Sequence, residues 1–219
     1  MIEAERVIVA LDMLDEGRAL DLADRLRPAG IQWFKVGLSL WVHAGRSVVD
    51  ALKARGVNVF LDLKLHDIPH QVGLATEAAS NLGVDLLTIH AAGGEAMMRA
   101  AVASRSGATR ILAITVLTSL ETDPAVVSDR ALRARESGVD GVVCSPLEVG
   151  ALRDRHAPPF LLVTPGVRPT GSVVGDQKRV ATPEQALASG SDLLVIGRPI
   201  TQALDPVAAA RQIIAGTVG

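Results

Sequence analysis

Short apolar segments alternate with longer amphipathic segments along this chain. The apolar segments are rich in β-branched residues, which is typical of buried strands. The segments between them are rich in Ala, Leu, Arg and Glu, and several end in Gly or Pro just before the next apolar run, as helices do. The pattern predicts eight strands, at residues 5–12, 32–38, 57–64, 84–91, 110–117, 139–145, 160–165 and 191–197.

Strands that alternate with helices favour a parallel sheet with right-handed crossovers. Eight such units within 219 residues fit a compact α/β fold, the (β/α)8 or TIM barrel. A doubly wound open sheet is the alternative. No linker, low-complexity segment or internal repeat divides the chain, so we expect one domain over residues 1–219. Its longest loop after a strand, at about 166–181, is expected to act as a lid over a phosphate.

The segment FLDLKLHDIPH, at residues 60–70, places charges within an apolar strand. Because side chains alternate across a strand, Phe60, Asp62 and Lys64 share one face and the three leucines share the other. The leucine face suits packing against helices, whereas the charged face requires water, a partner or a ligand. Taken alone, the segment also fits an edge strand with a solvated face or a structural ion pair.

Polar and glycine-rich residues follow most of the other predicted strands as well. Asp12 ends the first strand, Lys35 lies near the end of the second, Asp67 follows the third and Ser145 ends the sixth. In a barrel these strand ends meet at one mouth, where active sites lie. Such clustering favours an active site. A lysine beside a developing carbanion can stabilise it and deliver a proton, so the residue types suggest proton transfer, aldol cleavage or decarboxylation.

The loop at 166–181 has a composition suited to phosphate. It contains several glycines together with Arg168 and Gln177, and the segment after the eighth strand adds Gly197 and Arg198. Glycines permit close backbone approach, and guanidinium, amide and backbone N–H groups bind phosphate oxygens. Barrels often bind phosphate at the loops after strands 7 and 8. The alternative is a surface loop whose charges are merely solvated.

Composition argues against several other classes of function. The formal net charge is −2, with 22 basic and 24 acidic residues, and aromatic residues make up 2%. Neither nucleic-acid binding nor membrane binding is therefore expected. The single cysteine, Cys144, and the absence of a recognisable leader predict a cytoplasmic protein. His66 and His70 are separated by Pro69 and have no evident third partner, so no metal site is predicted.

Segments distributed over nearly the whole chain resemble the orotidine 5′-phosphate decarboxylase family: ALD (10–12), FKVG (34–37), FLDLKLHDIP (60–69), TIHAAGG (88–94), VVCSPLE (142–148), TPGVRP (164–169), GDQKRVATP (175–183) and VIGRPI (195–200). The resemblance implies decarboxylation of orotidine 5′-monophosphate to UMP, the last step of de novo pyrimidine nucleotide biosynthesis. It also implies that neither a metal nor an organic cofactor takes part.

The resemblance also assigns roles to individual residues. Lys64 corresponds to the proton donor to C6 of the pyrimidine, and Asp62 to the carboxylate that faces the departing CO₂ group. Lys35 and Asp67 complete the charged array, and Asp67 is expected to reach the site of the partner in a homodimer. The expected substrate-binding residues are Asp12 at the ribose, Ser145 at the pyrimidine, Lys35, Ile68, Gln71, Thr118, Pro165, Arg168, Gln177, Gly197 and Arg198. Gln71 departs from the family, which often has Thr there; a longer amide could make a similar hydrogen bond to the ribose.

Two rival functions remain. The hexulose-phosphate synthases and keto-gulonate-phosphate decarboxylases share the D-x-K-x-x-D pattern, but they depend on Mg²⁺ and place an acid where this chain has Lys35, whose ammonium would repel the metal. A non-catalytic phosphate-binding barrel is the other rival. It would have no need of Lys64 between two aspartates.

Overall fold

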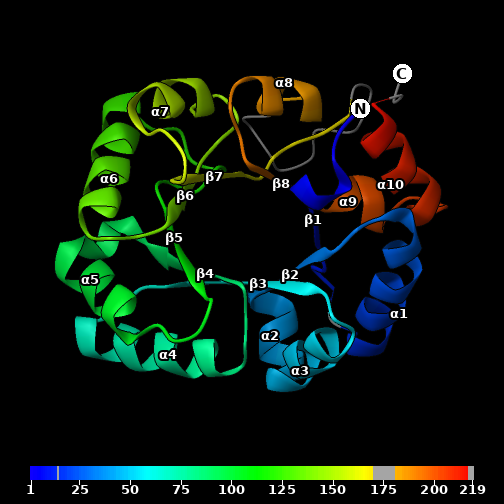
Figure 1. The fold of residues 1–219 in the computed structure, drawn as a ribbon, viewed down its shortest axis with the longest axis horizontal. Helices are drawn as coiled ribbons and strands as arrows, with labels where there is room; N and C mark the ends of the chain where they lie inside the picture. The colour runs from blue at the N-terminus through cyan, green and yellow to red at the C-terminus, as the bar shows by residue number, and fades with distance from the viewer. Residues whose placement is uncertain (14, 170–180, 217–219) are drawn as a thin grey trace.

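Eight parallel strands form a closed barrel, each paired with the next and β8 paired with β1. The protein was analysed as a computed structural model that describes residues 1–13, 15–169 and 181–216. Figure 1 shows the strands as an inner ring surrounded by helices. The strands are β1 (Val7–Ala10), β2 (Trp33–Gly37), β3 (Asn58–Leu65), β4 (Leu86–His90), β5 (Arg110–Ile114), β6 (Gly141–Val143), β7 (Leu161–Thr164) and β8 (Leu193–Ile196).

All eight predicted strands are present, and the barrel rather than the open sheet is confirmed. Most predicted strands were too long. The segment 139–145, for example, contributes only Gly141–Val143 to the sheet. Apolar residues beyond the strand ends remain buried in the connecting loops, Cys144 among them, which is why hydrophobicity alone overestimates strand length.

The helices cover the outside of the barrel (Figure 1). They are α1 (Glu16–Leu26), α2 (Leu38–Ala44), α3 (Arg46–Ala54), α4 (Pro69–Asn81), α5 (Gly94–Ser104), α6 (Pro124–Glu136), α7 (Val149–Arg155), α8 (Pro183–Ala188), α9 (Arg198–Thr201) and α10 (Pro206–Ala215), with short 3-10 turns at Ala4–Arg6, Arg27–Ala29 and Ala91–Gly93. The backbone N–H of Ile2 donates to the carbonyl of Ile214 at 2.7 Å, so α10 closes the ring against the N-terminal segment.

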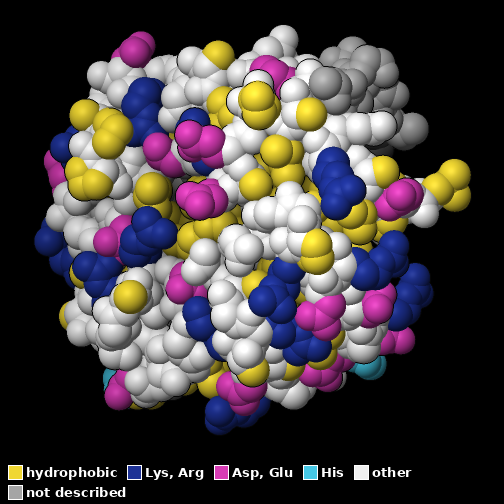
Figure 2. All heavy atoms as spheres, turned by 45° about the vertical axis from the view of Figure 1, so that its right-hand side comes forward, with side chains coloured by type: hydrophobic (Ala, Val, Ile, Leu, Met, Phe, Trp, Pro, Cys, Tyr) yellow, Lys and Arg dark blue, Asp and Glu magenta, His cyan; other side chains and the backbone are white. Residues whose placement is uncertain are grey.

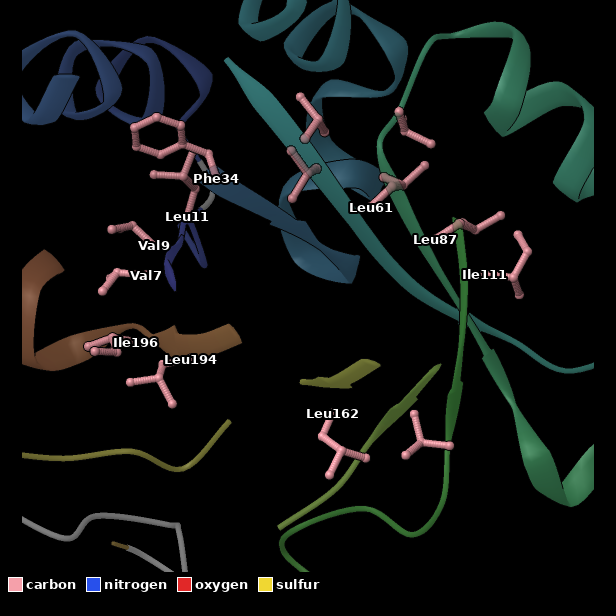
Figure 3. Packing of buried hydrophobic residues seen from close by; sticks show 14 of the residues in the cluster. Val7, Val9, Leu11, Phe34, Leu61, Leu87, Ile111, Leu162, Leu194 and Ile196 are labelled. Atoms are coloured by element: carbon pink, nitrogen blue, oxygen red, sulfur yellow. The ribbon is translucent and has the colours of Figure 1, made fainter. Parts of the chain in front are cut away.

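Side-chain alternation along the strands produces two apolar layers. Val7 and Val9 belong to the larger layer, between strands and helices, whereas Ile8 and Ala10 belong to the smaller layer inside the barrel. Figure 3 shows residues of the larger layer, Phe34 of β2 and Leu61 of β3 among them, arranged around the ring of strands. The inner layer fills the barrel beneath its mouth, which leaves only the ends of the strands for polar chemistry.

A repeated Gly-x-Asp segment stabilises the end of the barrel opposite the mouth. It occurs as Gly83–Asp85, Gly138–Asp140 and Gly190–Asp192, directly before β4, β6 and β8. Each glycine has a positive φ after a helix, and each carboxylate accepts a backbone N–H bond at 2.7 Å from the preceding strand. Each also pairs with a cation from the helix that precedes this partner strand, or from the segment just after that helix.

The surface around α1 and α10 mixes charges of both signs. Figure 2 shows Lys and Arg side chains interspersed with Asp and Glu side chains, mainly in the lower half of this face. One such contact is the two-fold hydrogen bond of Arg55 to Asp24, at 2.9 and 3.0 Å. Within the described ranges, no helix is long and apolar enough to cross a membrane.

Candidate active site

Two lysines and two aspartates from β2, β3 and the segment after β1 form a network at the mouth of the barrel. Lys35 Nζ lies 2.6 Å from Asp12 Oδ1 and 3.6 Å from Asp62 Oδ2. Lys64 Nζ lies 2.6 Å from the same Asp62 Oδ2. Lys35 and Asp62 are only 7% and 8% exposed, so the ion pairs at the base of this network are shielded from bulk water. Opposite charges alternate at these distances, so each buried charged group has a partner.

The alternation predicted for β3 is confirmed, because Phe60, Asp62 and Lys64 all line the same cavity. The pairing of β3 with β4 shifts register between Leu61 and Leu65. Within this irregular stretch Lys64 has a φ of 55°, and it is the one residue other than glycine with a positive φ among those described. A left-handed conformation costs an L-residue about 1–2 kcal/mol. In this strained conformation the ammonium group of Lys64 points toward Asp62.

Thr88 of β4 holds the strained segment in place. Its hydroxyl donates to Asp62 Oδ1 at 2.9 Å and accepts the backbone N–H of Lys64 at 2.9 Å. The side chain is completely buried. The Thr88 hydroxyl therefore positions both the carboxylate of Asp62 and the backbone of Lys64, which pairs with that carboxylate.

Asp62 is ionised despite its burial. Burial acts to raise the pKa of its carboxyl, but the charges of Lys35 and Lys64, with hydrogen bonds from Lys64 and Thr88, outweigh it and leave the pKa below its ordinary value. A permanent negative charge thus stands directly beside the ammonium of Lys64.

Gly37, at the end of β2, makes room for this network. A Cβ atom there would lie 2.5 Å from Asp12 Oδ1 and 2.8 Å from Lys35 Nζ. Any larger side chain would displace the ion pair, so the glycine of the FKVG segment is required by close approach.

The network opens into a cavity of about 450 Å³, a size suited to a small-molecule ligand. Opposite the lysines, its wall comes from the segments after β7 and β8, through Pro165, Arg168, Gly197 and Arg198. Arg168 Nε is buried with no hydrogen-bond partner among the described residues. Burial, followed by the charge of Arg198, lowers the pKa of Arg168. Two guanidinium groups in one wall are chemically suited to hold an anion such as a phosphate.

The structure brings most of the predicted site residues together, but not all. The predicted residues that line the cavity are Asp12, Lys35, Asp62, Lys64, Thr118, Pro165, Arg168, Gly197 and Arg198. Asp67, Ile68 and Gln71 are exposed outside it. Ser145 is fully buried at the end of β6 and does not line it either. Gln177 and most of the predicted loop lie outside the described residues.

His66 and His70 do not form a metal site with other side chains. The ring of His66 instead packs against that of His90, with centroids 5.4 Å apart. In the described part of the chain, no three His, Cys, Asp or Glu side chains are placed to hold a metal ion.

Residues 5–213 match the family model described as the orotidine 5′-phosphate decarboxylase / HUMPS family. The chain belongs to this family. Proteins named orotidine 5′-phosphate decarboxylase from Moorella thermoacetica and Teredinibacter turnerae are 50% and 45% identical to it. The alignments cover 96% and 97% of this chain, and 91% and 97% of those proteins.

Solved structures of the family agree with the fold. The orotidine 5′-phosphate decarboxylase of Lactobacillus acidophilus superposes with a TM-score of 0.84 at 37% identity, covering 98% of this chain and 100% of that one. The decarboxylase of Pyrococcus horikoshii superposes with a TM-score of 0.81 at 25% identity, covering 97% and 99%.

Sequence reasoning missed several residues of the site. Thr88 stands in the sequence only as part of the TIHAAGG segment, because its contacts with Asp62 and Lys64 depend on how β3 and β4 pair. Thr201 and Gln202, just after the IGRPI segment, also line the cavity. Their proximity to Arg198 in the sequence was the available clue.

Proposed function

We propose that this protein decarboxylates orotidine 5′-monophosphate to UMP, the last step of de novo pyrimidine nucleotide biosynthesis. The observation that carries the proposal is the ion-pair network of Lys35, Asp62 and Lys64 at the base of the cavity. Relatives that share up to 50% identity over nearly the full chain bear the name of this activity.

In the proposed reaction the bond between C6 and the carboxylate carbon breaks, CO₂ leaves, and the electron pair remains on C6. Lys64 stabilises this carbanion electrostatically and then transfers a proton from its ammonium group to C6. Water returns a proton to the lysine afterwards. Asp62 faces the departing group and orients the ammonium group of Lys64, since Lys64 Nζ donates to Asp62 Oδ2 at 2.6 Å.

The rest of the cavity suits the remainder of a nucleotide. Arg168, Arg198 and Gly197 are proposed to bind the phosphate, with Gln177 added from the part of the chain not described. Asp12 is proposed to bind the ribose, because it lines the cavity and pairs with Lys35 while its side chain remains 55% exposed. The cavity draws residues from β1, β2, β3, β5, β6 and β8 and from the segment after β7, which supports our view that the chain acts as one domain.

We also propose that the protein is a homodimer with Asp67 completing the site of its partner, and that Ile68 and Gln71 contact substrate there as well. Two observations support this. Asp67 and Gln71 are exposed beside the mouth but do not line the cavity of their own chain. The apolar side chains of Leu38, Val42 and Ile68 are 60%, 75% and 62% exposed. Exposed apolar residues of this size commonly mark protein interfaces.

The cytoplasm is the compartment that we propose.

A magnesium-dependent sugar-phosphate reaction is the competing function, because the family name includes HUMPS. The ammonium of Lys35 lies within 3.6 Å of the carboxylates of both Asp12 and Asp62. It therefore neutralises two carboxylates that such an enzyme would need for its metal. This geometry favours the metal-independent decarboxylation.

The direct test is to mix the purified protein with orotidine 5′-monophosphate in EDTA and to follow the ultraviolet absorbance as orotate becomes uracil. We expect rapid conversion, with UMP as the product. Lys64→Ala should lower turnover by about 10²–10⁴-fold or more, as expected for loss of a positioned proton donor. Lys53→Ala, which removes a lysine at the opposite end of the barrel, is the matched control and should retain activity.

Absence of turnover in EDTA, with activity on a sugar phosphate once Mg²⁺ is added, would replace the proposal by the competing function. A Lys64→Ala protein within an order of magnitude of wild type would remove this lysine from its proposed role. Tight phosphate-ligand binding without any turnover would instead indicate a non-catalytic barrel.

A further inference from the structure

A second cavity lies between α6 and α7, outside the barrel. Its volume is about 610 Å³, and it is lined by Pro124, Ala125, Ser128, Asp129, Leu132, Arg135, Ala151, Arg155 and His156. The α6 residues among these recur along one face of the helix. In this fold the helices run antiparallel to the strands. The end of the groove that holds Arg135, Arg155 and His156 therefore lies away from the mouth of the barrel.

His156 is the unusual residue of this groove. It is only 2% exposed, and neither ring nitrogen has a hydrogen-bond partner within the described ranges. One side of the ring packs against Phe160, with centroids 5.1 Å apart. Leaving buried polar groups unpaired costs about 1–3 kcal/mol, and native proteins rarely do so without a reason.

Two arginines beside His156, Arg135 and Arg155, also make few polar contacts. Arg135 Nη1 makes only a long contact, 3.4 Å, to the carbonyl oxygen of Arg155. Neither guanidinium has a carboxylate within ion-pair distance in the described part of the chain. By contrast, their sequence neighbours Arg133 and Arg153 pair with acids, at 2.9 Å to Asp129 and 2.5 Å to Asp192.

The one acid that lines the groove, Asp129, does not form an ion pair with Arg135 or Arg155. Arg133 bonds both oxygens of Asp129, at 3.1 and 2.9 Å, and thereby neutralises it. Arg135 and Arg155 also lie near helix C-termini, whose carbonyls attract cations. That attraction accounts for basic residues at this place, but it leaves the unpaired nitrogens of His156 without an explanation.

We propose that this groove binds a small organic anion, a phosphate or carboxylate, through Arg135, Arg155 and His156. The apolar part of the ligand lies along Leu132 and its neighbours on α6. The volume suits a ligand of this kind, since small-molecule sites commonly measure 300–1,000 Å³. Charge-assisted hydrogen bonds from guanidinium groups are the usual means of holding both kinds of anion.

The state of the histidine is consistent with this role. Burial, followed by the charges of Arg135 and Arg155, lowers the pKa of His156. The neutral ring offers one N–H to an anion. An anion seated between the ring and the two guanidinium groups would raise this pKa, since it favours the charged form of the ring.

The test uses the full-length protein labelled with ¹⁵N-histidine. The chain has five histidines, and loss of one resonance in His156→Asn assigns the signal. Inorganic phosphate, acetate and phenyl phosphate are titrated separately at constant ionic strength, with KCl as the reference salt. We expect a saturable shift of the His156 resonance with phosphate or acetate, a raised pKa for this ring, and tighter binding of phenyl phosphate than of inorganic phosphate.

The charge-matched variants decide which residues hold the anion. Arg135→Ala/Arg155→Ala should weaken binding at least about tenfold, the effect of losing one charge-assisted hydrogen bond. Arg25→Ala/Arg46→Ala removes two arginines of α1 and α3, outside the groove, and should leave the affinity unchanged. A His156 resonance that responds no more to the anions than to KCl, or equally in both double variants, would overturn the proposal. Equal affinities for the two phosphates would remove the apolar wall from it.

Discussion

Asp62 is held between two ammonium groups, and its charge depends on them. Burial opposes ionisation of this carboxyl, while Lys35, Lys64 and the hydroxyl of Thr88 favour it. The same contacts hold Lys64 at a φ that non-glycine residues avoid. Strain of this kind persists only where surrounding contacts enforce it, and it concentrates at functional sites. The residues proposed to perform the chemistry therefore also contribute to the stability of the barrel mouth.

Asp62→Asn should lower the free energy of unfolding at neutral pH by about 3 kcal/mol, because it leaves two lysines facing each other without their shared carboxylate. The folded-state pKa of Asp62 lies below the ordinary value of 3.8. Its contribution is therefore complete above that pH and is lost as the pH falls through the lowered pKa. Urea unfolding should show a constant difference between wild type and variant down to about pH 4, and a shrinking difference below.

The control for this experiment is Asp50→Asn, which removes an exposed carboxylate paired with Arg46 on the surface. It should not alter stability measurably at any pH, because exposed pairs contribute little. A wild-type advantage over Asp62→Asn that persists undiminished to pH 2 would show that the carboxylate charge is not what stabilises the mouth.

At the level of secondary-structure elements, the two ends of the barrel have different roles. The mouth collects charges for chemistry, whereas the opposite end uses the Gly-x-Asp segments to join consecutive strands. The carboxylate of Asp85 accepts both the backbone N–H of Val59 and the ammonium of Lys53, each at 2.7 Å. The same contact occurs before β4, β6 and β8, so it fixes the position at which every second strand begins. These segments lie at the end of the barrel opposite the cavity.

Asp85→Ala should lower the free energy of unfolding by about 1–3 kcal/mol, because it leaves the backbone N–H of Val59 unpaired. Lys53→Ala removes only the ion pair, whose side chains are 30% and 26% exposed, and should cost at most about 1 kcal/mol. Both variants should keep the kcat of wild type under conditions where they are folded. Equal losses of stability would assign the effect to the ion pair instead, and a lower kcat in folded Asp85→Ala would couple this end to the mouth.

The elements and the site were predictable to different degrees, for physical reasons. Hydrophobic period and helix-ending glycines suffice for the order of strands and helices, and alternation suffices to place Asp62 and Lys64 on one face. The positive φ of Lys64 depends on a register shift against β4, which is a tertiary event. The role of Thr88 depends likewise on the neighbouring strand. Local patterns do not record contacts of this kind, nor the unpaired nitrogens of His156.

At the scale of the whole molecule, the cavity of one chain lacks one member of the predicted charged array. Asp67 is exposed and accepts only the backbone N–H of Ile68, at 2.6 Å, among the contacts described. It lies in the loop between β3 and α4, beside the exposed apolar side chain of Ile68. A two-fold dimer buries the same patch on both chains. Such an arrangement would bring each Asp67 to the other chain's site while covering the apolar residues around it.

Asp67→Ala and Lys64→Ala proteins should each be nearly inactive, but a mixture of the two should recover activity once subunits exchange. In a hybrid dimer, the site built on the Asp67→Ala chain keeps its own Lys64 and receives an intact Asp67 from the partner. The other site lacks both groups. Random exchange should therefore restore up to about a quarter of wild-type turnover, because half of the dimers are hybrids with one intact site each. Turnover is measured after mixing, and subunit exchange is verified by mass with one isotopically labelled chain.

Mixing Lys64→Ala with an Asp62→Ala/Asp67→Ala chain is the control, since that hybrid has no complete site and should stay inactive. Demonstrated exchange without recovery in the first mixture would mean that Asp67 does not serve the neighbouring site.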